Sequence, residues 1–230
     1  MPNKSTYFIK SIIDLFLGII VLLIAFPFMI VIALILIIIF RTLPFIIQKR
    51  GITEENQVFN IYKFKTIKPN SENNIRRDRN ILYKSQLLDY IPAFCRWLRK
   101  SGLDELPQLI NVIKREMSLI GPRPLMVSDL NILRDKYPEY YRKRQAITVK
   151  PGITGLWQVY GDRRRGIENL INFDIEYNEK VSVSLDIEIF LATLPLLFRG
   201  KHSDAIIYGM KESRLANSTT SIRIDNTFVV

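Results

Sequence analysis

RKSGLDELPQLINVIKREMSLIGPRP, residues 99–124, is the stretch from which the fold and the chemistry of this chain can be inferred. Within it, two adjacent carboxylates, Asp104 and Glu105, precede Pro107. Proline has no N–H and its ring crowds the carbonyl four residues earlier, so Pro107 is expected in the first turn of a helix. The acidic pair then falls at the helix N-terminus, where the helix dipole stabilises ionised carboxylates and bound anions.

Apolar and polar side chains of this stretch fall on different helical stripes. The apolar stripe is Leu103, Leu106, Ile110 and Ile113, and the polar stripe is Asp104, Gln108 and Asn111. The ordinary interpretation of an Asp-Glu pair at such a position is a cap on a core helix. However, Arg99 precedes the pair, and Arg123 follows it between Pro122 and Pro124. Carboxylates, a metal ion and guanidinium groups together suit a pyrophosphate substrate.

Composition narrows the class of protein. The chain has 230 residues and a net charge of +11, which indicates one catalytic domain with an anchor and a polyanionic partner. Nucleic acid, anionic lipid and phosphorylated substrates all fit that charge, and the apolar N-terminus favours membrane and phosphate. A single cysteine and a single histidine exclude an intrachain disulfide and a Cys/His zinc cluster.

An uncharged apolar run, residues 15–40, is long enough to span a bilayer and is expected to be retained rather than cleaved as a signal peptide. Pro27 divides the run into halves that are each too short to cross alone. Basic residues flank both ends, which places both ends in the cytoplasm. A bent helix that enters and leaves by one leaflet satisfies both observations. Just before this run, Lys10 and Asp14 lie one turn apart and are expected to pair, with a solvated pair of no consequence as the alternative.

The remaining segments are expected to complete a small α+β domain. Residues 44–66 predict a hairpin, in which Lys63 and Lys65 are interpreted mainly as charges that protect an edge strand. Gly152 and Gly155 are expected to serve backbone turns in a segment that could line a nucleotide site. The apolar helix predicted near 185–198 fits an interfacial helix beside the anchor or a plain core helix equally well.

Several ordered motifs together resemble the bacterial sugar transferases, small monotopic polyprenyl-phosphate phosphoglycosyl transferases. The motifs are SGLDELPQLINVIKREMSLIGPRP, QKRG (48–51), IYKFKT (61–66), VKPGITGLWQV (149–159) and FDIEYNEKVSVSLDIEIF (173–190). The resemblance covers the chain to about residue 200. It implies a mostly helical α+β fold, with a re-entrant membrane helix at 1–40, a cytoplasmic catalytic domain at 41–202 and a polar tail at 203–230. The implied location is the cytoplasmic face of the bacterial inner membrane, with membrane lipids and no nucleic acid as partners.

The resemblance also implies a reaction and the roles of individual residues. A nucleoside diphosphate-sugar gives its phosphosugar to a polyprenyl phosphate and releases the nucleoside monophosphate. Asp104 is then the nucleophile, and Glu105 assists as metal ligand or as base; both carboxylates are expected to bind Mg²⁺. Arg99 and Arg123 are expected to bind phosphate, with Pro122 and Pro124 stiffening the turn. Arg163 is expected to replace an arginine that the family places directly after a glycine, and a solvated charge run is the alternative.

Two other classes of function compete with a transferase. A membrane-anchored basic scaffold would bind lipid or nucleic acid without turnover, so conservative changes at Asp104 and Glu105 would be silent. A membrane hydrolase would pass the phosphosugar to water, and product analysis with and without polyprenyl phosphate separates it from a transferase.

Overall fold

The computed structural model describes residues 4–68, 90–162 and 165–199, so Arg163 and the tail at 203–230 lie outside the described residues. The described part is mostly helical, as expected from the sequence, and it has two small sheets, of which only the hairpin was expected. Its elements in chain order are α1 (Lys4–Phe40), β1 (Phe45–Gly51), β2 (Phe59–Phe64), α2 (Ala93–Ser101), the 3₁₀ helix η3 (Leu103–Gln108), α3 (Leu109–Ile113), β3 (Ser118–Ile120), β4 (Leu125–Met126), α4 (Val127–Lys136), α5 (Pro138–Gln145), β5 (Gly152–Thr154), α6 (Leu156–Tyr160), α7 (Gly166–Lys180) and α8 (Val183–Arg199).

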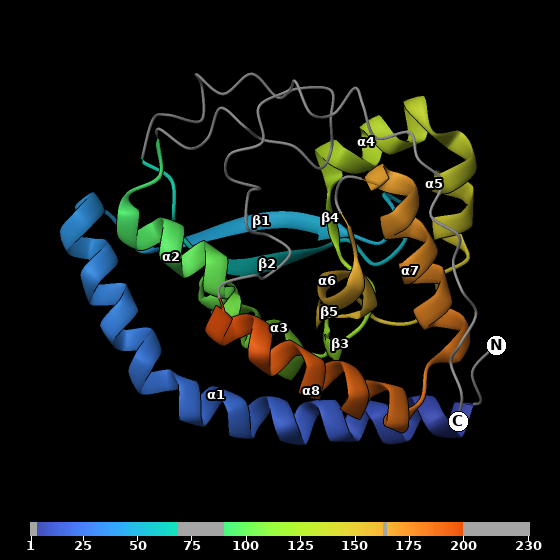
Figure 1. The fold of residues 1–230 in the computed structure, drawn as a ribbon, viewed down its shortest axis with the longest axis horizontal. Helices are drawn as coiled ribbons and strands as arrows, with labels where there is room; N and C mark the ends of the chain where they lie inside the picture. Colours follow the sequence, from blue (N-terminus) through green and yellow to red (C-terminus); the bar gives the residue numbers. More distant parts are fainter. Residues whose placement is uncertain (1–3, 69–89, 163–164, 200–230) are drawn as a thin grey trace.

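The N-terminal apolar run forms one continuous helix, α1, which contains Pro27. Its residues Tyr7–Phe40 are long and apolar enough to cross a membrane. In Figure 1 the first part of α1 runs beside α8, and the ribbon then turns toward α2 at its far end. Because α1 is continuous from Lys4 to Phe40, Pro27 does not divide the apolar run into two separate helices.

One side of α1 belongs to the protein core. Its buried apolar residues recur at helical spacing and pack with side chains of α2 and α3; they are Ala25, Met29, Ile32, Leu36 and Phe40. Full burial of a Met, Ile, Leu or Phe side chain contributes roughly 1.5–3 kcal/mol to the free energy of folding. Nearer the N-terminus, Gly18 brings α1 close to α3, because a Cβ at Gly18 would lie 3.0 Å from Cγ1 of Val112.

The predicted hairpin is confirmed. Strands β1 and β2 pair antiparallel, with Phe45 opposite Phe64, and β4 pairs with the other side of β1. The order β2-β1-β4 leaves β2 at an edge of this sheet. A second, two-stranded sheet pairs β3 with β5 in parallel.

The segment predicted as one amphipathic helix is instead η3 followed by the short α3. Gly102, with a φ of 73°, separates it from α2, and Pro107 cannot donate the backbone hydrogen bond that an α-helix needs. The polar stripe is also the more buried one: Gln108 is 2% exposed and Asn111 is fully buried, whereas Ile110 is 39% exposed. Gln108 on η3 and Asn111 on α3 are thus directed inward, which apolar periodicity alone does not predict.

Gly152 and Gly155, which were expected to serve backbone turns, instead allow close packing of two backbone segments, and Gly152 begins strand β5. A Cβ at Gly152 would overlap the backbone nitrogen of Gly121, and one at Gly155 would overlap the Gly121 carbonyl. The N–H of Gly121 donates to the Thr154 carbonyl at 2.9 Å, and this hydrogen bond joins the segment after β3 to the end of β5. These glycines hold the chain that follows β3 close to β5.

Helix α8 lies beside the first part of α1 (Figure 1) and is apolar on two faces. Ile189 is fully buried, whereas Ile187 and Leu191 are more than half exposed. The helix therefore contributes to the core and leaves an apolar strip at the surface, so it combines features of the two alternatives that the sequence left open.

Candidate active site

The two predicted catalytic carboxylates lie side by side in the interior. They sit in the first turn of η3, where Asp104 is 2% exposed and Glu105 is 3% exposed. Burial of two adjacent carboxylates is costly unless cations and hydrogen-bond donors compensate their charge. The compensating groups define the site.

Lys63 is one of those cations. Its Nζ lies 2.6 Å from Glu105 Oε1 and 3.4 Å from Asp104 Oδ2, and the side chain is buried. The interpretation of Lys63 as a protective edge charge is therefore wrong, although β2 is an edge strand. The cause is that η3 packs on β2 and covers this lysine. The only sequence signal was its place in the motif IYKFKT, which carried no assigned role.

Arg123 is a second cation near the acidic pair. Its Nη2 lies 4.0 Å from Glu105 Oε1, and its guanidinium carbon lies 5.7 Å from the centre of the Trp157 ring, within cation–π range. The carbonyls of the flanking prolines are both bonded: Pro122 accepts from Gly152 N at 2.9 Å, and Pro124 accepts from Arg50 Nη1 at 3.1 Å. The proline-bounded turn is thus tied down on both sides of Arg123.

Arg99 lies on α2, one turn before η3, and its Nη1 donates to Thr66 Oγ1 at 3.0 Å. It is near the site because α2 packs on η3, which carries the acidic pair. Burial raises the pKa of Cys95 to about 11, while Arg99 lowers it and Asp104 raises it. The structure therefore brings Asp104, Glu105 and Arg123 into one cluster with Lys63 and places Arg99 at its border.

The donor set is compatible with Mg²⁺. Asp104 Oδ1 is buried and accepts no hydrogen bond within the described part of the chain. Among the described residues there is no cluster of three or more His, Cys, Asp or Glu side chains that could form an all-protein metal cage. Mg²⁺ is commonly held by one or two carboxylates together with substrate phosphates and water, so Asp104 and Glu105 fit a metal that arrives with its substrate.

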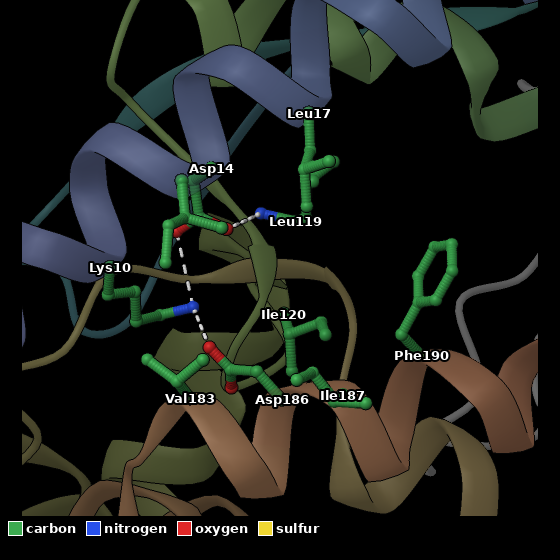
Figure 2. A pocket seen from close by; sticks show the side chains of 10 residues that line it. Lys10, Asp14, Leu17, Leu119, Ile120, Val183, Asp186, Ile187 and Phe190 are labelled. Atoms are coloured by element: carbon green, nitrogen blue, oxygen red, sulfur yellow. Dashed lines mark hydrogen bonds and ion pairs between the residues drawn. The ribbon is translucent and has the colours of Figure 1, made fainter.

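A second buried polar cluster joins α1 to α8 (Figure 2). Lys10 Nζ lies 3.2 Å from Asp14 and 2.6 Å from Asp186 Oδ2. The predicted pair of Lys10 with Asp14 is confirmed, but it is buried rather than solvated, and Asp186 is a third member that sequence spacing does not reveal. Burial raises the pKa of Asp186, while Lys10 lowers it. Tyr177 completes the cluster by donating to Asp186 Oδ1 at 2.6 Å.

An otherwise apolar pocket lies beside this cluster (Figure 2). Leu17 on α1 and Ile187 and Phe190 on α8 line it and are also exposed at the surface. The charged groups at its edge are already paired with one another. This region is therefore best described as a structural joint between α1 and α8.

Comparison with known proteins gives one consistent result. Residues 5–200 match the family model described as bacterial sugar transferase. The chain is 32% identical over 213 residues to the undecaprenyl-phosphate galactose phosphotransferase of Salmonella typhimurium, covering 86% of this chain and 42% of that protein. It is 31% identical over 165 residues to the galactosyl transferase CpsE of Streptococcus agalactiae, covering 68% of this chain and 35% of that protein. It is 32% identical over 169 residues to the exopolysaccharide production protein ExoY of Sinorhizobium fredii, covering 66% of this chain and 70% of that protein. The chain thus spans less than half the length of the first two relatives.

Proposed function

Because this chain belongs to the bacterial sugar transferase family, we propose that it transfers a phosphosugar from a nucleoside diphosphate-sugar to a polyprenyl phosphate and releases the nucleoside monophosphate. The observation that carries this proposal is the convergence of Lys63 and Arg123 on the buried carboxylates Asp104 and Glu105. The relative from Salmonella typhimurium is named an undecaprenyl-phosphate galactose phosphotransferase, which supports the class of acceptor. The product would start the assembly of a membrane glycoconjugate or polysaccharide.

In the first step, a carboxylate oxygen of Asp104 attacks the phosphorus that carries the sugar. A P–O bond to Asp104 forms, and the bond from this phosphorus to the bridging oxygen breaks. The bridging oxygen leaves with the nucleoside monophosphate, and the phosphosugar stays on Asp104 as an acyl phosphate. Covalent catalysis of this kind divides one difficult displacement into two easier ones.

In the second step, a phosphate oxygen of the polyprenyl phosphate attacks the same phosphorus. The acyl phosphate P–O bond breaks, Asp104 regains its carboxylate, and a polyprenyl diphosphate-sugar forms. Glu105 is adjacent to the reacting centre and would act as base for the incoming phosphate or as metal ligand. Lys63 and Arg123 supply positive charge near oxygens that gain negative charge in both steps.

Asp104 and Glu105 would also hold Mg²⁺. When bound, the ion supplies charge neutralisation for the diphosphate. Arg123, with its planar guanidinium, is suited to bind two phosphate oxygens at once, and Arg99 at the border of the site would contact the same group.

The membrane arrangement that fits this chemistry is monotopic. We place residues 1–40 in the cytoplasmic leaflet of the inner membrane as a re-entrant helix that bends at Pro27, with residues 41–202 as the catalytic domain on the cytoplasmic face. The exposed apolar side chains of α1 and the strip of Ile187 and Leu191 on α8 would contact lipid. This arrangement presents the acidic pair to a soluble sugar nucleotide and to a lipid-linked acceptor from the same side.

The test is a turnover assay with the purified full-length chain in a lipid bilayer or detergent. A panel of nucleoside diphosphate-sugars is supplied with undecaprenyl phosphate and Mg²⁺, and release of nucleoside monophosphate is followed. Release that requires undecaprenyl phosphate supports a transferase. Release of sugar phosphate into water without the acceptor indicates a hydrolase, and the absence of turnover with the whole panel contradicts the proposal.

A further inference from the structure

The main chain of Arg123 is held by a buried ion pair that is separate from the acidic pair. Arg144, on α5, has no exposed surface, and all three of its guanidinium nitrogens donate hydrogen bonds. Nε donates to the Ile52 carbonyl at 2.6 Å, Nη2 donates to the Arg123 carbonyl, and Nη1 donates to Asp174 Oδ2. Every guanidinium nitrogen of Arg144 therefore has a hydrogen-bond acceptor inside the protein.

Asp174, on α7, completes the arrangement from the other side. Its Oδ1 accepts the backbone N–H of Arg123 at 3.1 Å, while its Oδ2 pairs with Arg144. The N–H and the C=O of Arg123 are therefore both bound, one by each member of a single ion pair. Burial raises the pKa of Asp174, and the nearby guanidinium groups of Arg144 and Arg123 oppose this shift.

This arrangement fixes the backbone of the residue that lies between the two prolines. Pro122 and Pro124 fix their own φ angles, and a proline also restricts the residue that precedes it. The remaining freedom lies in the orientation of the peptide groups on either side of Arg123, which Asp174 and Arg144 hold. The side chain then extends to Glu105 and Trp157.

We propose that Arg144 and Asp174 are positioning residues for Arg123, which they orient toward the phosphate groups of the donor by binding its N–H and its C=O. A buried ion pair is often no more stabilising than apolar residues of the same volume. Stability alone therefore does not explain why Arg144 and Asp174 occupy these positions, whereas orientation of Arg123 does. The part of this proposal that concerns phosphate rests on the proposed function. The part that concerns the main chain of Arg123 does not depend on it.

The first experiment measures hydrogen–deuterium exchange in the purified full-length chain. Within residues 119–126, the Arg123 amide should be protected in the wild-type protein. Asp174→Asn and Arg144→Lys should each speed its exchange by about ten-fold or more, because the hydrogen bond opens locally. Tyr141→Phe is the matched control: Tyr141 lies on the same helix as Arg144, and its hydroxyl donates to Glu55 at 2.6 Å and accepts from the Glu54 N–H. Unchanged exchange of the Arg123 amide in both Asp174→Asn and Arg144→Lys overturns the proposal, and so does equal acceleration in Tyr141→Phe.

The second experiment is a double-mutant cycle on turnover. Asp174→Asn alone should lower kcat/KM by about ten-fold or more and raise KM for the sugar nucleotide, whereas Tyr141→Phe should change neither by more than about two-fold. In an Arg123→Ala background, Asp174→Asn should cause no further loss, because it acts through Arg123. Losses that multiply would overturn the positioning role. Arg144→Lys keeps the charge and serves the same cycle if Asp174→Asn does not fold.

The two proposals fail in different ways. If no sugar nucleotide supports turnover of the wild-type chain, the proposed function is wrong, and the exchange experiment still decides whether the ion pair holds Arg123. If the wild-type chain turns over and Arg123→Ala is fully active, Arg123 does not bind the donor phosphate. The contacts of Arg144 and Asp174 with Arg123 then do not contribute to catalysis.

Discussion

Lys63 Nζ lies 2.6 Å from Glu105 Oε1, although 42 positions separate the two residues in the sequence. One comes from the edge strand of a hairpin and the other from a 3₁₀ turn, and both side chains are buried. The contact places a positive charge between two carboxylates. It also gives the sharpest prediction for the site, because a neighbouring lysine provides an internal control.

Lys63→Gln should lower kcat/KM by about ten- to a hundred-fold, since it removes a charge-assisted hydrogen bond worth roughly 1.5–3 kcal/mol. Lys65→Gln is the control, because Lys65 bonds Thr42 Oγ1 at the surface at 3.1 Å and should leave kcat/KM nearly unchanged. Steady-state kinetics of both variants decide the matter. Equal losses in the two variants would show that the positive charge of this segment, rather than the Lys63 contact, matters.

Asp104→Asn should abolish turnover, with a loss of at least about a thousand-fold, while the circular-dichroism spectrum stays that of the wild type. An amide is a far poorer nucleophile toward phosphorus than a carboxylate, and a charged metal ligand is lost as well. Mass spectrometry of wild-type protein quenched with sugar nucleotide alone should show a phosphosugar on the peptide that contains Asp104. Asp135→Asn, at an exposed carboxylate on α4, should remain active. Full activity of Asp104→Asn would rule out the covalent mechanism.

Arg123→Lys should lower kcat/KM by about ten-fold or more, because an ammonium group cannot replace a planar fork that binds two phosphate oxygens. The same exchange at the exposed Arg142 on α5 should have little effect. The comparison separates the shape of the guanidinium from its charge, since both variants keep the charge. Wild-type kinetics of Arg123→Lys would mean that charge alone is sufficient at this position.

Chelation of divalent metal should stop turnover without changing the melting temperature. The described residues contain no all-protein metal cage, so an ion held by Asp104 and Glu105 with substrate phosphates would contribute to catalysis and little to folding. EDTA treatment followed by titration with MgCl₂ tests this, with activity and thermal unfolding measured on the same samples. Turnover that persists in excess EDTA would contradict the role of Mg²⁺.

The membrane arrangement predicts that Lys4 and Lys49 both face the cytoplasm. Cys95 is changed to Ala, although its buried thiol has a pKa raised to about 11 and is expected to react slowly. Single cysteines at positions 4 and 49 should then resist an impermeant thiol reagent applied from the periplasmic side. Adding Pro27→Leu should straighten α1 and expose position 4 to the reagent. Labelling of position 4 in the chain that keeps Pro27 would show that the segment spans the membrane.

The sequence predicts those features of the fold and the site that depend on local pattern. The apolar run, the hairpin, the acidic pair in the first turn of its helix and the Lys10–Asp14 pair all follow from periodicity or spacing of a few residues. The 3₁₀ geometry of η3 was not predicted, because the turn depends on Gly102 and Pro107 acting together within a packed structure.

The long-range contacts that the sequence did not reveal have a common physical cause. Lys63 with Glu105, Lys10 with Asp186 and Arg144 with Asp174 join residues 42, 176 and 30 positions apart. A lysine or arginine side chain is usually solvated, so only three-dimensional packing reveals that these cations are buried. Buried ion pairs between residues far apart in the sequence are therefore the contacts that sequence patterns do not predict.

The close contact between Gly18 and Val112 means that the N-terminal helix is not a detachable anchor. Helix α1 packs directly on α3, which continues η3, and its buried side chains Leu36 and Phe40 share a core with α2. Deletion of α1 to obtain a shortened soluble form would uncover that core. Because side-chain packing rather than a linker joins the two parts, a change in the tilt of α1 would also shift η3, which carries Asp104 and Glu105.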